Sequence, residues 1–360
     1  MSGMERNQKI DVVRCVSNYL IILLHAWAAF QYVSWEGFEF VAWTVICSHL
    51  SWLAIPTFFM ISGFFLFKGY QVSKYLSKIV RRLKRLAVPY IMWNILFVIF
   101  YLSLAHFVPR LSSRVTSFGL DSFSGAFEKI LSLTVAPIDG PLWFLRAIFL
   151  LAIFSPIIWL VMKLSRGLIT ILLCIAWCLL ESFLGFSKAM SHCVPAYAIT
   201  CFVIGGIVAM NGKDLIVLFR HYGFIILGII ACLLRAGIMI PTLMNNEELS
   251  IIESGVCSIL SIVEAPVLLS IFARINVDKI VNSRLYSIFK EMSFFAYAGH
   301  FLFCSMILHS IAPLIKGYWP GKFSLLIIVF FVCGVSLMML VYAIGKRFCP
   351  RVMKLFDGTL

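Results

Sequence analysis

The chain has 360 residues, of which 62% are hydrophobic and only 13% are charged. Because soluble domains are about 45–50% apolar and about 25% charged, this composition excludes an ordinary soluble globule. The 30 Lys and Arg residues exceed the 16 Asp and Glu residues and give a formal net charge of +14. In a soluble protein such an excess would point to a nucleic acid, but here it has to be tested first as a signal of membrane topology.

Ten apolar stretches are long enough to cross a bilayer, which takes about 20 residues of α-helix. In chain order they cover residues 12–33, 41–66, 86–108, 141–162, 167–186, 193–211, 216–240, 252–273, 293–313 and 323–345. With the N-terminus in the cytoplasm, most Lys and Arg residues fall in cytoplasmic connections, of which residues 67–85 are the most basic. The positive-inside rule therefore puts both termini in the cytoplasm. The sequence predicts an all-α, polytopic integral membrane protein with about ten transmembrane helices, folded as a single domain over residues 1–360.

Other common site types have no support in the sequence. The 11 cysteines lie mostly inside apolar stretches and form no C-x-x-C pair, so we interpret them as packing residues and predict no bound metal. Neither a Gly-x-Ser-x-Gly elbow, nor a Walker loop, nor a His-Glu-x-x-His motif is present. A serine hydrolase, an ATP-driven pump and a zinc protease are therefore not indicated.

Ionisable side chains are rare in the predicted spans, where such groups tend to face a bundle interior or a water-filled cavity. Arg14 and His25 are eleven residues apart on the first stretch, which puts them on one helix face about 16 Å apart. Asn18 lies on the same stripe. Arg14 is then expected near the cytoplasmic boundary and His25 beyond the middle of the bilayer. The alternatives are a snorkelling anchor for Arg14 and a hydrogen-bonded packing residue for His25.

Four further segments carry polar and aromatic patterns. They are residues 55–64 with Ser62 and Gly63, residues 81–85 followed by Pro89 and Tyr90, residues 142–145 with Trp143, and residues 293–300 with Tyr297 and His300. Together with the Arg14-x10-His25 spacing, this ordered set resembles acyltransferase family 3, whose members are integral membrane enzymes that acylate, and mostly O-acetylate, carbohydrates. The likeness covers essentially the whole chain. Cys15 departs from the family pattern, which usually has Gly there, and Pro141 stands where a His is common.

The resemblance implies an acyl-coenzyme A donor, expected to be acetyl-coenzyme A and to act as a substrate, with no bound cofactor, and a carbohydrate or lipid-linked glycan acceptor. Arginine forks bind phosphate well, so we expect the donor near the cytoplasmic side, bound by Arg82, Arg85 and His300. Histidine is the natural base for acyl transfer to a hydroxyl, and we assign His25 this role, with Arg14 as the second catalytic residue. The substrate-binding residues are expected to be Trp143, Ser62 and Asn18.

Each of these assignments has an ordinary alternative. The arginines could bind lipid phosphates, Trp143 could belong to an interfacial aromatic belt, and Ser62 with Gly63 could simply permit close helix packing. Further polar residues are expected in the outer half of the bilayer or near its middle, with His49 among them as a lesser candidate base. The charged ones, which we interpret as mutually neutralising ion pairs, are Arg146, Arg235, Glu181, Glu253 and Glu264.

The sequence thus predicts a bacterial inner-membrane O-acetyltransferase that acts on a cell-surface carbohydrate, with membrane lipids as further partners and no nucleic acid. A transporter or flippase of an anionic or carbohydrate substrate would explain intramembrane charge equally well. A lipid-binding assembly factor for a polysaccharide machine is a third alternative, in which His25 would matter no more than any packing residue.

Overall fold

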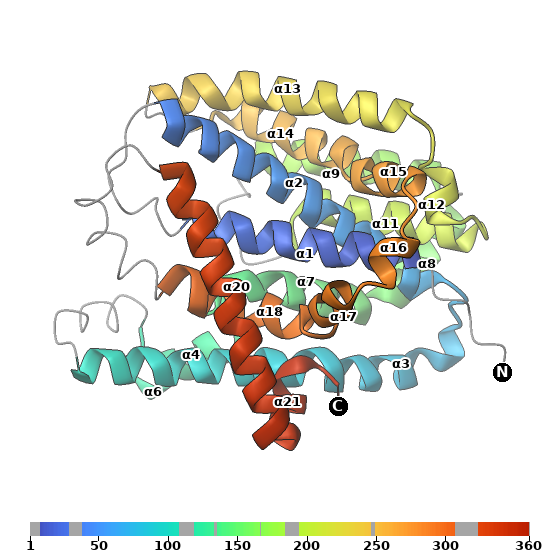
Figure 1. Ribbon diagram of the computed structural model, residues 1–360. Coiled ribbons are helices and arrows are strands. Elements are labelled where there is room, and N and C mark those ends of the chain that lie inside the picture. Colours follow the sequence, from blue (N-terminus) through green and yellow to red (C-terminus); the bar gives the residue numbers. More distant parts are fainter. Residues whose placement is uncertain are drawn as a thin grey trace.

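The computed structural model describes residues 8–28, 38–107, 119–132, 135–165, 167–183, 194–245, 249–306 and 323–359. Within these ranges the regular secondary structure is helical and no strand occurs, so the predicted all-α class is confirmed (Figure 1). Six of the described helices are long and apolar enough to cross a membrane, and one bent pair raises the number to seven. The chain is therefore a multi-pass membrane protein, although this number falls short of the ten spans predicted.

The helix bounds are as follows. The first half of the chain forms α1 (Gln8–Ala28), α2 (Phe38–Phe67), η1 (Val72–Lys74), α3 (Tyr75–Arg82), η2 (Leu83–Ala87), α4 (Val88–Phe107), α6 (Phe123–Leu131), η4 (Gly140–Leu142), α7 (Trp143–Ile153), α8 (Ser155–Leu164) and α9 (Leu168–Phe183). The second half forms α11 (Ala196–Met210), α12 (Leu215–Leu218), α13 (Gly223–Met244), α14 (Ile251–Glu264), α15 (Val267–Arg274), α16 (Asp278–Val281), α17 (Arg284–Glu291), α18 (Ser293–His300), η5 (Phe301–Met306), α20 (Phe323–Phe348) and α21 (Pro350–Asp357).

The spans that differ from the prediction do so for local reasons. The stretch predicted at 141–162 is broken at Phe154, where α7 and α8 meet at a bend of 62°. Pro156 accounts for the break, because it has no N–H to donate to the carbonyl of Ala152. The stretches predicted at 167–186 and 193–211 form α9 and α11, which are apolar but shorter than a full span. The stretch predicted at 293–313 starts as α18 and η5, and its remainder lies outside the described residues.

The centre of the bundle is the contact between α2 and α11, with α1 packed against α2 (Figure 1). Gly63 on α2 and Gly205 on α11 allow the two backbones to approach closely. A Cβ atom at Gly63 would lie 1.9 Å from the carbonyl oxygen of Phe202, and one at Gly205 would lie 1.9 Å from that of Met60. Small residues of this kind are the usual means of close helix packing in membranes.

One long rod runs from η1 through α3, η2 and α4 along an edge of the bundle (Figure 1). Its middle, η2, is a π-helix in which the N–H of Val88 donates to the carbonyl of Leu83. Pro89 explains this widened turn, because it cannot donate to the carbonyl of Arg85 as an α-helical residue would. The rod therefore carries Lys84 and Arg85 on a turn wider than that of an ordinary helix, directly after Arg81 and Arg82 of α3.

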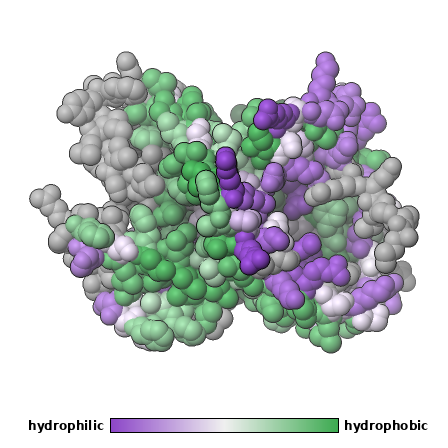
Figure 2. Space-filling view, turned by 60° about the horizontal axis from the view of Figure 1, so that its bottom comes forward, coloured by the Kyte–Doolittle hydropathy of each residue, from purple (hydrophilic) through white to green (hydrophobic). Residues whose placement is uncertain are grey.

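The surface separates into apolar and polar parts. Figure 2 shows mostly hydrophobic residues over the left of one face and hydrophilic residues gathered towards its right, the end at which α3 and α16 lie in Figure 1. Helix α13 exposes Leu227, Leu233 and Leu234 among other apolar side chains. An exposed leucine face of this length is expected to contact lipid.

Candidate functional site

A cavity of about 560 Å³ opens between α1, α2, α7 and the α17–α18 corner, and Arg82 from α3 lies at its edge. Its polar lining includes Arg14, Asn18, Ser62 and Lys290. Four of the site residues predicted from the sequence, Arg14, Asn18, Ser62 and Arg82, thus line one cavity. They come from three different helices, α1, α2 and α3. Three cationic side chains, Arg14, Arg82 and Lys290, border the cavity together with the acidic Asp11 and Glu291, so its arginine side is suited to an anionic ligand.

A second cavity of about 390 Å³ adjoins the first and shares Arg14 and Arg82 with it. Arg81 and Arg85 complete its basic lining. The π-turn of η2 lies here, and such widened turns are frequent at functional sites. The two cavities together place four arginines around one region, which is the geometry that several phosphate groups on one ligand require.

The inner wall of the larger cavity is apolar, formed by Phe58 and Ile61 of α2 and by Phe144, Leu145 and Ile148 of α7. The space is therefore basic at one side and hydrophobic at the other. A ligand with a charged portion and a small apolar portion fits such a division.

Asn18 fixes the relative height of α1 and α18. Its Nδ2 atom donates to the carbonyl of Ser293 at 2.8 Å and to the Ser293 hydroxyl at 3.1 Å. Seven residues further along each helix, which is about two turns and the same face, lie His25 and His300. The two imidazole rings are consequently neighbours, with ring centroids 4.8 Å apart.

His300 is fully buried. Its Nδ1 atom lies 2.5 Å from the carbonyl oxygen of Tyr297, so Nδ1 carries the proton that this carbonyl accepts. The Nε2 atom then has a lone pair, and it has no hydrogen-bond partner in the described part of the chain. The histidine pair therefore offers at least one nitrogen that could accept a proton from a substrate.

Tyr297 connects the cavity to the histidine pair. Its side chain lines the cavity, its carbonyl holds His300, and its hydroxyl donates to the carbonyl of Pro141 at 2.5 Å. Tyr297 thus links the cavity that Arg14 lines to the two histidines. His300, however, was expected among the cytoplasmic arginines, and the structure instead places its ring against His25.

Trp143 lines neither of the two cavities described above. It is partly buried, with its ring centroid 6.1 Å from that of Phe59 and in an edge contact with Phe144. This position favours packing at the start of α7 over stacking on a ligand. Its predicted substrate contact stays a prediction.

The expected outer charges include a buried ion pair. Arg235 and Glu264 pair at 3.0 Å, and both are fully buried. Glu253 instead caps the N-terminus of α14 at the surface, Glu181 accepts the backbone N–H of Ala196, and Arg146 donates to backbone carbonyls. The interpretation as mutual ion pairs thus holds for one pair.

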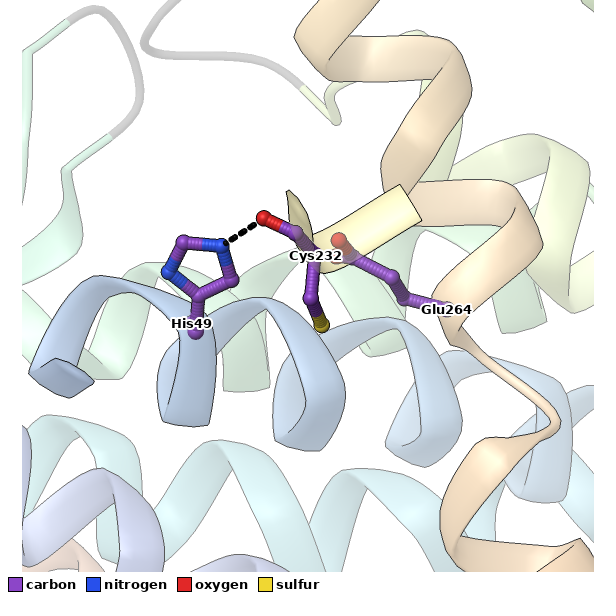
Figure 3. Close-up of side chains that lie close together, drawn as sticks. All are labelled: His49, Cys232 and Glu264. Atoms are coloured by element: carbon purple, nitrogen blue, oxygen red, sulfur yellow. Dashed lines mark hydrogen bonds between the residues drawn. The ribbon is translucent and has the colours of Figure 1, made fainter. Parts of the chain in front are cut away.

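His49, Cys232 and Glu264 approach one another beside that pair, with their potential ligand atoms within 4.8 Å (Figure 3). Both ring nitrogens of His49 already face carbonyl oxygens, those of Val45 and Cys232, at 2.7 and 2.8 Å. Both carboxylate oxygens of Glu264 accept from Arg235. A cation would have to displace these bonds and lie beside the guanidinium, so we interpret the cluster as structural.

Sequence reasoning missed three charged residues of the cavity, Asp11, Lys290 and Glu291. The Lys290 Nζ atom lies 3.0 Å from Asp11 Oδ2, so the two form an ion pair in the cavity wall. Asp11 precedes Arg14 by three residues and shares its helix face, a spacing that could have revealed it. Lys290 was interpreted only as one of the positive charges that set the membrane topology, and no local sequence pattern distinguishes it from the others.

Comparison with known proteins gives one match. The model of a family described as an acyltransferase domain, Acyl_transf_3, matches residues 7–344, nearly the whole chain. No curated protein and no solved structure matches the chain. The matched range includes every residue assigned above to the cavities and to the histidine pair.

Proposed function

The chain belongs to acyltransferase family 3, and we propose that it is a membrane O-acyltransferase that moves an acetyl group from cytoplasmic acetyl-coenzyme A to a hydroxyl of a cell-surface carbohydrate. The acceptor would be an O-antigen, an exopolysaccharide or a related lipid-linked precursor. The membrane would be the inner membrane of a bacterium. The observation that carries the proposal is the position of Tyr297, which borders an arginine-lined cavity and holds His300, the buried partner of His25, through its carbonyl.

The arginines support the donor end of the proposal. Arg14, Arg82 and Arg85 surround adjoining cavities, and a coenzyme A molecule carries several phosphate groups that arginine forks can hold. The apolar wall at Phe58 and Phe144 would then receive the acyl thioester. Ser62 and Asn18, which line the same cavity, are placed to contact the donor beyond its phosphates.

The histidines support the chemical step. In the proposed reaction His25 removes the proton of the acceptor hydroxyl, and the oxygen attacks the thioester carbon. The carbon–sulfur bond breaks, the acyl group stays on the acceptor oxygen as an ester, and coenzyme A leaves as a thiol after gaining a proton. His300, whose ring contacts that of His25, is the neighbour that can orient it or share its proton. Arg14 lies too far along α1 to join this step directly and acts through the donor.

The proposal is tested by thioester turnover in the purified protein in nanodiscs. With acetyl-coenzyme A and a lipid-linked saccharide fraction from the host membrane, we expect free thiol to appear with a matching amount of base-labile ester. The His25→Ala variant should release neither product above background. The rival transporter would leave acetyl-coenzyme A intact in every sample, and that result would refute the acyltransferase proposal.

A further inference from the structure

A short buried segment before α7, residues 139–142, packs beside the histidine pair. Within it Asp139 and Leu142 are fully buried. Two bonds from distant helices hold the segment: the N–H of Asp139 donates to Asn94 Oδ1 on α4 at 3.2 Å, and the Tyr297 hydroxyl donates to the carbonyl of Pro141. Asn94 is itself buried and donates to the carbonyl of Tyr90. The backbone of this segment is therefore fixed from two sides.

The Asp139 carboxyl group lacks a hydrogen-bond partner among the described residues. It is fully buried, and neither of its oxygens has a hydrogen-bond partner in the part of the chain that the structure describes. Buried polar groups are nearly always paired, and an unpaired one costs stability, so this exception calls for an explanation. Burial raises the pKa of the Asp139 carboxyl well above its ordinary value. A carboxyl group offers acceptor oxygens in either protonation state and one O–H donor when it is protonated.

The segment is close to the proposed site of acyl transfer. Gly140, the next residue, has its Cβ position 4.0 Å from the Phe301 ring, and that ring lies 6.0 Å from the His25 ring. On the other side Tyr297, which holds the segment through Pro141, has its ring 5.9 Å from that of His300. Asp139 is thus next to a residue that approaches Phe301, and Phe301 and Tyr297 both flank the histidine pair.

We propose that Asp139 binds the acceptor, by hydrogen bonds to hydroxyl groups of the carbohydrate that receives the acyl group. This inference rests on the proposed function. A hydroxyl both donates and accepts, so it satisfies the Asp139 carboxyl in a way that an aliphatic or purely cationic ligand does not. Asn94 and Tyr297 are positioning residues, because they hold the backbone on either side of Asp139 and touch no acceptor themselves.

The test uses Asp139→Leu, which keeps the branched shape and the number of heavy atoms and removes the unpaired polar atoms. Replacing an unpaired buried polar group by an apolar one of the same shape is expected to leave thermal stability nearly unchanged. Transfer to the host's lipid-linked saccharide fraction should fall about tenfold or more, because a buried hydrogen-bonded contact is lost. Binding of acetyl-coenzyme A, measured by its saturable effect on thermal unfolding, should not change.

Two further variants complete the experiment. Asp139→Asn keeps a donor and an acceptor, so we expect an intermediate loss that a higher concentration of the saccharide fraction partly restores. Asp121→Leu, an exposed aspartate of the same connection, is the control and should match the wild type in all three measurements.

The outcomes separate the inference from the proposed function. Unchanged transfer by Asp139→Leu with an active wild type would show that Asp139 does not contact the acceptor, and the inference would fail while the proposed function stands. A fall in melting temperature proportional to the loss of transfer, in both Asp139 variants, would show a structural role and would also overturn it. A wild type that transfers nothing would overturn both proposals.

Discussion

Gly63→Ala tests whether the contact between α2 and α11 sets the shape of the cavity. An added Cβ atom would lie 1.9 Å from the carbonyl oxygen of Phe202, and real Cβ atoms essentially never come closer than 3.0 Å to another heavy atom. The clash is with backbone, so no side chain can rotate away. The two helices would have to separate by about 1.1 Å to relieve it.

The expected cost follows from that separation. A gap of about 0.5–1 Å already removes a quarter to a half of the dispersion attraction across an interface. Overpacking a well-packed core typically costs about 1–3 kcal/mol, and a backbone clash belongs at the upper end. We therefore expect Gly63→Ala to lose about 3 kcal/mol of unfolding free energy, and to raise the KM for the donor because Ser62 and Ile61 move with α2.

The assay is thermal unfolding of the purified protein in one detergent, combined with donor titration. Gly237→Ala is the matched control, because a Cβ there meets no atom within 4 Å. In that helix interior Ala should be neutral or slightly stabilising, since Gly costs up to about 1 kcal/mol relative to Ala. Equal melting temperatures for Gly63→Ala and Gly237→Ala would refute the close approach of the two helices.

Three further predictions concern charged groups. Glu264→Gln should lower the melting temperature strongly, because removal of one partner from a buried ion pair costs about 3–5 kcal/mol; an unchanged melting temperature would contradict the Arg235–Glu264 pair. Arg82→Ala should raise the KM for acetyl-coenzyme A about tenfold or more, because a charge-assisted bond is lost. The control Arg351→Ala, at an exposed position of α21, should leave this KM unchanged. Equal KM values for the two variants in steady-state kinetics would remove Arg82 from the donor site. Prolonged treatment with a chelator should leave both activity and melting temperature unchanged, and a loss that zinc restores would show that the His49 cluster binds metal after all.

The sequence was sufficient for the fold class and for several cavity residues. Long apolar stretches specify helices in a membrane, because only a helix pairs its own backbone groups there. The spacing on α1 correctly put Arg14 and Asn18 on one face, and both line the cavity. Span length was predicted less well, since the break at Phe154 depends on how one proline is accommodated, and a hydropathy window does not resolve it.

The pairing of His300 with His25 could not be predicted from depth alone. Depth was counted from the end of each apolar window, but the register between α1 and α18 is set by the bond from Asn18 to Ser293. The equal spacing of seven residues from Asn18 to His25 and from Ser293 to His300 was the available signal, and it becomes informative only once the first contact is known. The unpaired carboxyl of Asp139 has no sequence signature, because its isolation is a property of packing.

The most direct test of the central claim is the O-acetyl content of the host's surface polysaccharide, measured by proton NMR with and without mild base. The cells would carry the wild type, His25→Ala, His106→Ala or no copy of the gene, with membrane abundance of the three proteins matched. His106 is exposed at the end of α4 and serves as the control histidine. We expect an ester signal that requires the gene, disappears with His25→Ala and persists with His106→Ala. The same ester signal in cells that lack the gene, or in cells with His25→Ala, would contradict it.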